Sequence, residues 1–325
     1  MNADLAALSN QFIYAAMAVY TLALITFAIA LAATRGNTVT VERTRELATV
    51  GAGGPAPVGA DAATSASDAT ELAPGRRSGN IGMSLTWLAT GLLLIGVVLR
   101  GMSAGRVPWG NMYEFSITAA LAVAVAFLVL SLRHDVRWLG VFVVGAVLLT
   151  LGLAVTVLYT ESAQLVPALK SWWLVIHVSA AIICAGGFTL SFVLSGAYLI
   201  RARGERRSPD GLPAGWLSSR LPASAKLDRL AYQVVAFTFP LWTFAVIAGA
   251  IWAENAWGRY WGWDPKETWA FITWVIYAGY LHARATAGWK GQRAAWICVA
   301  AFAAFIFNYF GVNIFMTGLH SYAGV

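Results

Sequence analysis

Aromatic residues are concentrated in one short segment of the chain, between positions 257 and 269. Four tryptophans and one tyrosine lie in it: Trp257, Tyr260, Trp261, Trp263 and Trp269. Glycines separate them at positions 258 and 262. Aromatic rings stack on flat ligands, and glycine lets backbone and rings approach such a ligand closely. Rings of this kind also anchor helix ends at membrane interfaces. The segment is therefore either a binding surface for a flat ligand or an interfacial belt, and the interleaved glycines favour the binding surface.

Two histidines are candidates for binding a metal beside this segment. His177 lies five residues after Trp172, and His320 lies near the end of the chain. Neutral imidazoles are common axial ligands of haem iron. We therefore predict His177 and His320 as axial ligands of a haem iron, provided that both lie on the membrane face of the tryptophan segment. Each histidine taken alone is more simply a polar side chain that packing satisfies.

A third histidine lies beyond the tryptophan segment. His282 follows Asp264 by eighteen residues, which is about 27 Å along a helix. An ionisable residue inside a membrane span is a functional candidate by default. The alternative is an interfacial histidine held by lipid headgroups.

The end of the tryptophan segment has the pattern of a helix start. Asp264 suits the N-cap, Pro265 the first helical position and Glu267 the third, which is the capping-box arrangement. Asp264 therefore either caps this helix or contacts the ligand directly, and we keep it among the candidate ligand-binding residues.

The composition is that of a membrane protein. Hydrophobic residues make up 59% of the chain, charged residues only 11%, and the mean hydropathy is +0.66, whereas soluble domains carry about 25% charged residues. The net charge of +7 would suit nucleic acid or anionic lipid. The basic residues lie in short loops between apolar runs, so we expect a lipid bilayer and no nucleic acid as partner. The two cysteines, Cys184 and Cys298, form no CxxC motif, and no disulfide framework is expected.

Eight apolar segments are long enough to cross a bilayer, because a spanning helix needs about 20 apolar residues. They are 11–33, 81–100, 115–132, 139–158, 172–200, 230–252, 269–286 and 294–315. The sequence thus predicts an all-α, polytopic helical bundle of about eight transmembrane helices. We divide it into a first transmembrane helix (1–33), a flexible cytoplasmic linker (34–80) and a membrane domain (81–325).

The basic residues predict the orientation of this bundle. With the N-terminus outside, only five of the 22 Lys and Arg residues lie on the outer side: Arg100, Arg106, Lys170, Arg259 and Lys266. Because cytoplasmic loops are the basic ones, both termini are expected on the outer side. The tryptophan segment, His177 and His320 then share the outer face, and His282 lies near the inner leaflet.

The tryptophan segment resembles a known signature. Its pattern, Trp257-Gly258-x-x-Trp261-x-Trp263-Asp264-x-Lys266-Glu267-x-Trp269, resembles the "WWD" motif of haem-handling proteins in cytochrome c maturation. The segment Pro108-Trp109-Gly110-Asn111-Met112-Tyr113-Glu114 resembles the CcsA/ResC branch of System II. The resemblance covers about residues 81 to 325, which it identifies as a cytochrome c assembly domain.

The resemblance implies a specific site and specific partners. It implies that haem b rests on the tryptophan segment, that His177 and His320 ligate its iron, and that His282 takes haem from the cytoplasmic side. It further implies a separate CcsB/ResB-type membrane partner, an apocytochrome c with a CxxCH motif, and a multi-pass location in the cell membrane. Candidate haem contacts are Trp257, Trp261, Trp263, Asp264 and Trp269.

Three functions are open at this point. The first is a membrane subunit of a cytochrome c synthase, of the haem lyase type, that carries haem outward and supports its thioether attachment. The second is a haem exporter or carrier without attachment chemistry. The third, an electron-transferring cytochrome b, would pair histidines inside spans, and only His282 lies deep.

Overall fold

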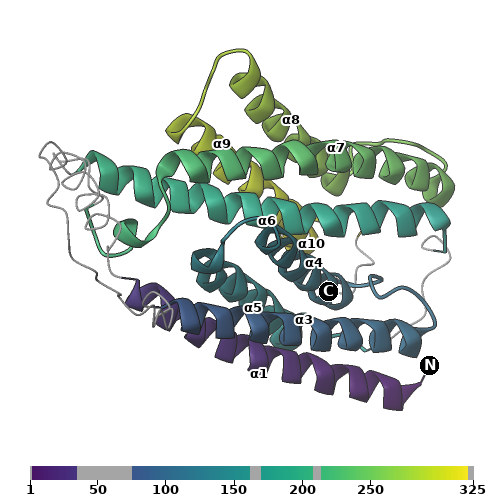
Figure 1. Cartoon of the computed structure of the whole chain (residues 1–325). Coiled ribbons are helices and arrows are strands. Elements are labelled where there is room, and N and C mark those ends of the chain that lie inside the picture. Colours follow the sequence, from purple (N-terminus) through teal and green to yellow (C-terminus); the bar gives the residue numbers. More distant parts are fainter. Residues whose placement is uncertain (1, 35–74, 162–169, 208–213, 321–325) are drawn as a thin grey trace, which may run out of the picture.

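The computed structural model describes residues 2–34, 75–161, 170–207 and 214–320, and within these ranges all regular structure is helical (Figure 1). The α-helices are α1 (Ala3–Ala33), α3 (Arg76–Ala104), α4 (Met112–Ser131), α5 (Gly140–Thr156), α6 (Trp172–Arg206), α7 (Ser224–Trp257), α8 (Pro265–Ala285), α9 (Gln292–Ile306) and α10 (Val312–Phe315). Short helical turns lie at Arg137–Leu139 and Ser218–Arg220, and a π-helical turn, η4 (Phe307–Gly311), joins α9 to α10.

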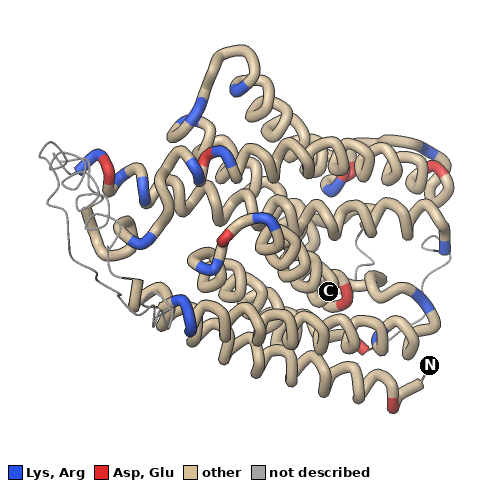
Figure 2. The backbone as a smooth tube through the Cα atoms, viewed as in Figure 1, with Lys and Arg blue, Asp and Glu red and all other residues tan. Residues whose placement is uncertain are grey.

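Seven helical segments of the described chain are long and apolar enough to cross a membrane. They are Ala3–Ala33, Arg76–Ala104, Met112–Ser131, Arg137–Thr156, Trp172–Arg206, Ser224–Trp257 and Gln292–Phe315. The prediction of an all-α, multi-pass membrane protein is therefore confirmed. Charged residues lie mainly at the ends of the long helices, and the middle of the bundle carries few (Figure 2).

Helix α8 differs from the span predicted at 269–286. The helix forms, but it is not among the segments apolar enough to cross a membrane by composition. Its sequence is rich in tryptophan, tyrosine and threonine, and it ends with His282 and Arg284 in its last turn. These side chains carry polar groups that lower the mean hydropathy although the helix is 21 residues long.

Several helices are longer than the predicted spans. Helix α6 has 35 residues and α7 has 34, so each is about 50 Å long at 1.5 Å per residue. A hydrocarbon core is about 30 Å thick, so both helices continue beyond it. Helix α3 begins at Arg76, inside the range 34–80 predicted as a linker; residues 35–74 of that range lie outside the described residues.

The helices pack through small residues. Helix α1 lies along α3, and α6 lies along α7 (Figure 1). A Cβ atom on Gly187 of α6 would lie 2.1 Å from Thr238 Oγ1 of α7, so only glycine permits this close approach of the two helices. Residues of α6, α7, α8 and α9 form a common buried cluster. This cluster holds the four helices together.

Candidate ligand-binding cavity

A cavity of about 200 Å³ opens where the tryptophan segment meets several helices of the bundle. Its lining is mostly aromatic and aliphatic and includes side chains of the loop before α4, of α6, α7 and α8, and of the η4 turn. The lining residues include Trp109, His177, Trp242, Gly249, Trp252, Trp257, Trp261, Lys266, Glu267, Asn308, Tyr309, Asn313 and His320. The structure thus brings together His177, His320, Trp257 and Trp261, which are separated by up to 143 residues in the sequence.

His177 enters the cavity from the first turns of α6. Its Nδ1 lies 2.7 Å from the carbonyl oxygen of Ala245 on α7. A carbonyl oxygen only accepts hydrogen bonds, so Nδ1 carries the hydrogen and donates it. In the neutral ring the other nitrogen, Nε2, then has a free lone pair. The ring also stacks on Trp252, with 6.3 Å between centroids and 7° between planes.

Gly249 of α7 makes room for the His177 ring. A Cβ atom at this position would lie 2.7 Å from both Cε1 and Nδ1 of the imidazole. This is closer than packed carbon atoms approach one another. The absence of a side chain at position 249 is therefore a condition for the observed position of His177.

His320 lies in the segment after α10, and an ionic partner fixes its ring. Its Nδ1 lies 2.8 Å from Asp264 Oδ2, and its ring lies 4.9 Å from that of Trp257 and 5.7 Å from that of Trp252. Burial lowers the pKa of His320 below its ordinary value, although the hydrogen bond to Asp264 opposes that shift. The neutral ring donates from Nδ1 to the carboxylate, and Nε2 is again left with a free lone pair.

Asp264 connects the start of α8 with the C-terminal segment. Its carboxylate accepts the backbone N–H of Lys266 at 3.4 Å and that of Leu319 at 2.7 Å, in addition to the His320 ring. Burial acts to raise the pKa of Asp264, but the hydrogen bonds from His320 and Leu319 outweigh it and hold this pKa below its ordinary value. Gly318 leaves room for the carboxylate, since a Cβ there would lie 2.5 Å from Oδ1.

The capping box predicted at the start of α8 is confirmed. Asp264 is the N-cap, and the Glu267 side chain accepts the backbone N–H of Asp264 at 3.0 Å. The same carboxylate accepts the N–H of Gly262 at 2.8 Å and pairs with Arg259 Nη1 at 3.0 Å. Asp264 does not itself line the large cavity, so its contacts are with the helix and with His320.

The two glycines of the tryptophan segment serve the loop. Gly258 ends α7 in a left-handed conformation, with φ of 69°, which favours glycine at a helix C-terminus. A Cβ on Gly262 would lie 2.1 Å from the Arg259 guanidinium. Neither glycine lines the cavity. These two glycines therefore serve the conformation of the loop and not, as their spacing suggested, the close approach of a ligand.

The remaining predicted residues lie away from the cavity lining. Trp263 is exposed, has a positive φ of 59° and packs its ring against Trp261 and Phe271. Trp269 packs on Phe307 at 4.2 Å. His282 is exposed in the last turn of α8, about 24 Å along the helix from the cavity residue Lys266. The structure therefore separates His282 from the other two candidate histidines.

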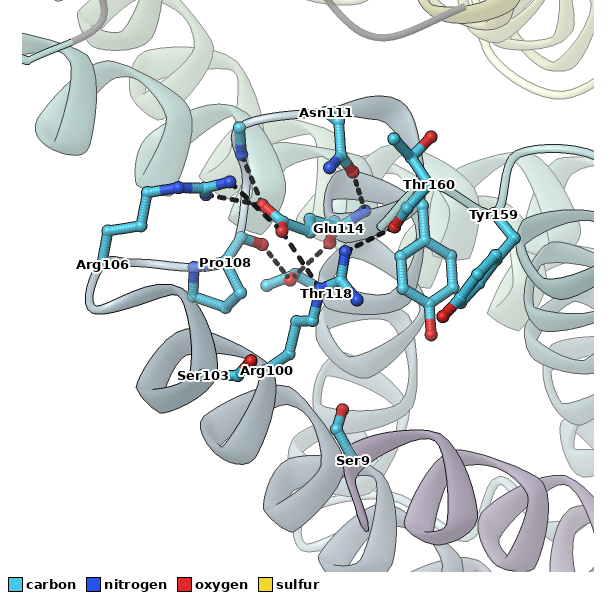
Figure 3. A network of polar contacts seen from close by, with 12 residues as sticks. Ser9, Arg100, Ser103, Arg106, Pro108, Asn111, Glu114, Thr118, Tyr159 and Thr160 are labelled. Atoms are coloured by element: carbon cyan, nitrogen blue, oxygen red, sulfur yellow. Dashed lines mark hydrogen bonds and ion pairs between the residues drawn. The ribbon is translucent and has the colours of Figure 1, made fainter. Parts of the chain in front are cut away.

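A buried ionic network holds the loop that forms one wall of the cavity (Figure 3). The Glu114 carboxylate accepts hydrogen bonds from Arg100 Nε at 3.1 Å, from Arg106 Nη1 at 2.6 Å and from Gly110 N at 2.9 Å. Arg100 and Glu114 are fully buried. Because Gly110 follows Trp109, the network fixes the part of the loop that carries this cavity residue.

Several cavity residues were not predicted from the sequence. They include Trp242, Gly249, Trp252, Lys266, Asn308 and Asn313. Three lining residues have a buried polar atom without a hydrogen-bond partner in the described chain: Trp109 Nε1, Trp242 Nε1 and Asn308 Oδ1. Such atoms are few in native structures, and a bound polar ligand would satisfy them. Trp252 precedes the first predicted tryptophan by five residues at the same helix end, a signal that the sequence did contain.

Comparisons with known proteins agree on one family. The family model described as "Cytochrome C assembly protein" matches residues 109–320. The "Cytochrome c biogenesis protein CcsA" of Picosynechococcus sp. is 34% identical over 297 residues, covering 75% of this chain and 87% of the relative. The protein of the same name from Guillardia theta is 35% identical over 261 residues, covering 74% and 85%. That of Brachypodium distachyon is 34% identical over 286 residues, covering 78% and 88%.

One solved structure supports the fold. The chain is similar to "Cytochrome c Heme Lyase CcmF" with a TM-score of 0.58 and 15% sequence identity, over 94% of this chain and 46% of that one. The chain thus spans less than half the length of that protein, and the likeness concerns the fold alone. With a family match over residues 109–320 and several relatives near 34% identity, the chain belongs to the CcsA family of cytochrome c biogenesis proteins.

Proposed function

We propose that the chain binds haem in the cavity beside the tryptophan segment and supports its covalent attachment to apocytochromes c. The observation that carries this proposal is the pair of imidazoles, His177 and His320, at one aromatic cavity. In each ring Nδ1 is held by an acceptor, so that Nε2 is free for iron. An acceptor that holds Nδ1 in this way orients a metal-ligating histidine.

The lining also suits the macrocycle of haem, in this proposal haem b. Indole rings of Trp252, Trp257 and Trp261 offer flat apolar surfaces. The unpaired N–H groups of Trp109 and Trp242 offer donors to a ligand that carries oxygen atoms. Trp263 and Trp269 support the loop, and Asp264 orients His320, so these three residues act without lining the cavity.

The proposed reaction places the apocytochrome beside iron-bound haem. The histidine of its CxxCH segment replaces one of the two ligands, and its two thiols then add to the haem vinyl groups. In each addition the S–H bond and the vinyl C=C π bond break. The sulfur forms a bond to one vinyl carbon and the hydrogen to the other, so no net oxidation occurs. The contribution of His177, His320 and the aromatic lining is to fix the plane and position of the substrate, and orientation of this kind lowers the barrier.

The remaining parts of the proposal concern topology and partners. Both termini and the cavity are assigned to the outer face of the cell membrane, because basic residues are sparse at that end of the predicted spans. His282, exposed at the other end of α8, is assigned to haem uptake from the cytoplasmic side. A CcsB/ResB-type membrane protein is the proposed partner in a System II synthase.

An attachment assay separates this synthase from the haem carrier. The chain is co-expressed with a CcsB/ResB partner and a CxxCH reporter, and the reporter is stained for haem after denaturing electrophoresis. The synthase predicts haem that resists denaturation on the reporter, and none on a reporter whose two cysteines are replaced by alanine. Haem that co-purifies with the chain without labelling the reporter would favour the carrier instead.

A further inference from the structure

The cavity contains one ammonium group, that of Lys266 in the first turn of α8. Its Nζ donates to Asn313 Oδ1 at 2.6 Å. None of the ion pairs found among the described residues includes this lysine. The acidic neighbour that also lines the cavity, Glu267, is already paired with Arg259. Among the described residues, the partly buried Lys266 ammonium group therefore has a neutral hydrogen-bond acceptor and forms no ion pair.

The stability of the helix does not explain a lysine at this position. Positive charge at a helix N-terminus opposes the helix dipole, and burial of an ammonium group without an anion carries a desolvation cost. Asp264, two residues before Lys266, directs its oxygens to His320, to Leu319 and to the backbone of Lys266. A ligand anion in the cavity would offset both costs.

The surroundings hold the ammonium group at the cavity. Asn313 donates from Nδ2 to the backbone oxygen of Tyr309 at 2.6 Å, which leaves its Oδ1 to accept from Lys266. Tyr309 in turn donates to the backbone oxygen of Met112 at 2.9 Å. The remaining unpaired polar atoms of the lining include the buried indole N–H of Trp242. The lining therefore suits a flat apolar ligand that carries an acidic group at its edge.

We propose that Lys266 binds a propionate carboxylate of haem and so fixes which edge of the macrocycle points into the cavity. This inference rests on the proposed function. Haem carries its two propionates along one edge and its two vinyl groups away from that edge. With a propionate at Lys266 and the iron between His177 and His320, the edge that carries the vinyl groups points away from Lys266. A fixed position of this vinyl edge is what attachment of the two thiols requires.

The test removes the charge separately from the ligand and from the protein. Purified full-length chain, made in haem-limited cells, is titrated with haem and with haem dimethyl ester, in which both propionates are neutral, and the dissociation constants are read from absorbance. Wild-type chain, Lys266→Met, Lys266→Arg and the matched control Lys170→Met are compared. Lys170 is exposed and does not line the cavity.

The wild type and Lys170→Met should bind haem about tenfold or more tightly than the ester, because a charge-assisted hydrogen bond is worth that factor. In Lys266→Met the preference should fall to near unity, and Lys266→Arg should keep most of it. A preference that survives in Lys266→Met overturns the inference, as does a wild type that binds both compounds equally. The latter comparison needs no variant to fold. A wild type that binds neither compound overturns the proposed function itself.

Discussion

Gly249→Ala is a small change that should act on His177 alone. The added Cβ would lie 2.7 Å from two atoms of the imidazole, and the ring cannot tilt freely because Trp252 stacks on it and Ala245 accepts from Nδ1. Overpacking of this kind costs about 1–3 kcal/mol, and a lost hydrogen bond adds about 1 kcal/mol. Alanine regains about 1 kcal/mol through helix propensity. The net destabilisation is therefore about 1–3 kcal/mol.

The assay combines the absorbance spectrum of bound haem with thermal unfolding in detergent. We expect Gly249→Ala to lose much of its six-coordinate haem and to resemble His177→Ala. Gly279→Ala is the matched control, because Gly279 lies in α8 and a Cβ there meets nothing within 4 Å. If both glycine variants keep the wild-type spectrum, the close fit between Gly249 and His177 does not matter for ligation.

Three further predictions concern residues that act on the cavity from outside it. Asp264→Asn keeps the shape of the side chain but removes the anionic acceptor of His320, so the purified chain should retain haem about tenfold less well than the wild type. The loss should be larger than in Asp264→Glu. Equal haem retention in the wild type and Asp264→Asn would count against orientation of His320 by Asp264. Glu114→Gln leaves two arginines beside a neutral group, and we expect a loss of about 3–5 kcal/mol in unfolding free energy, measured by denaturation and compared with exposed Glu161→Gln. His282→Ala should lower the amount of haem that reaches the chain in cells while leaving haem affinity of the purified chain unchanged; a lower affinity would contradict a role in uptake alone.

The sequence was sufficient for those features that depend on neighbouring residues. Apolar runs of about 20 residues gave the spans, since length and composition alone decide whether a helix can cross a bilayer. The helix start at Asp264, Pro265 and Glu267 was equally local, and α8 begins there. Helix α8 departs from this rule. Its tryptophans and tyrosines make the segment resemble an apolar span in the sequence, but their polar groups lower its mean hydropathy.

Features that join distant segments could not be read from the sequence. Asp264 is both a cap and the partner of His320, and nothing in the local pattern indicates that a residue 56 positions later lies against it. The same is true of Gly249, whose lack of a side chain matters only because His177 of another helix lies there. The sequence alone indicates that Lys266 is a basic residue of an outer loop, and only the structure shows that it lines a cavity.

The most direct test of the central claim is the absorbance spectrum of haem bound to the purified chain. If His177 and His320 ligate the iron, the wild type should show a six-coordinate, low-spin spectrum. The double variant His177→Ala with His320→Ala should lose it, and added imidazole should restore part of it. A double variant whose spectrum equals that of the wild type would show that other groups hold the iron and would contradict the account.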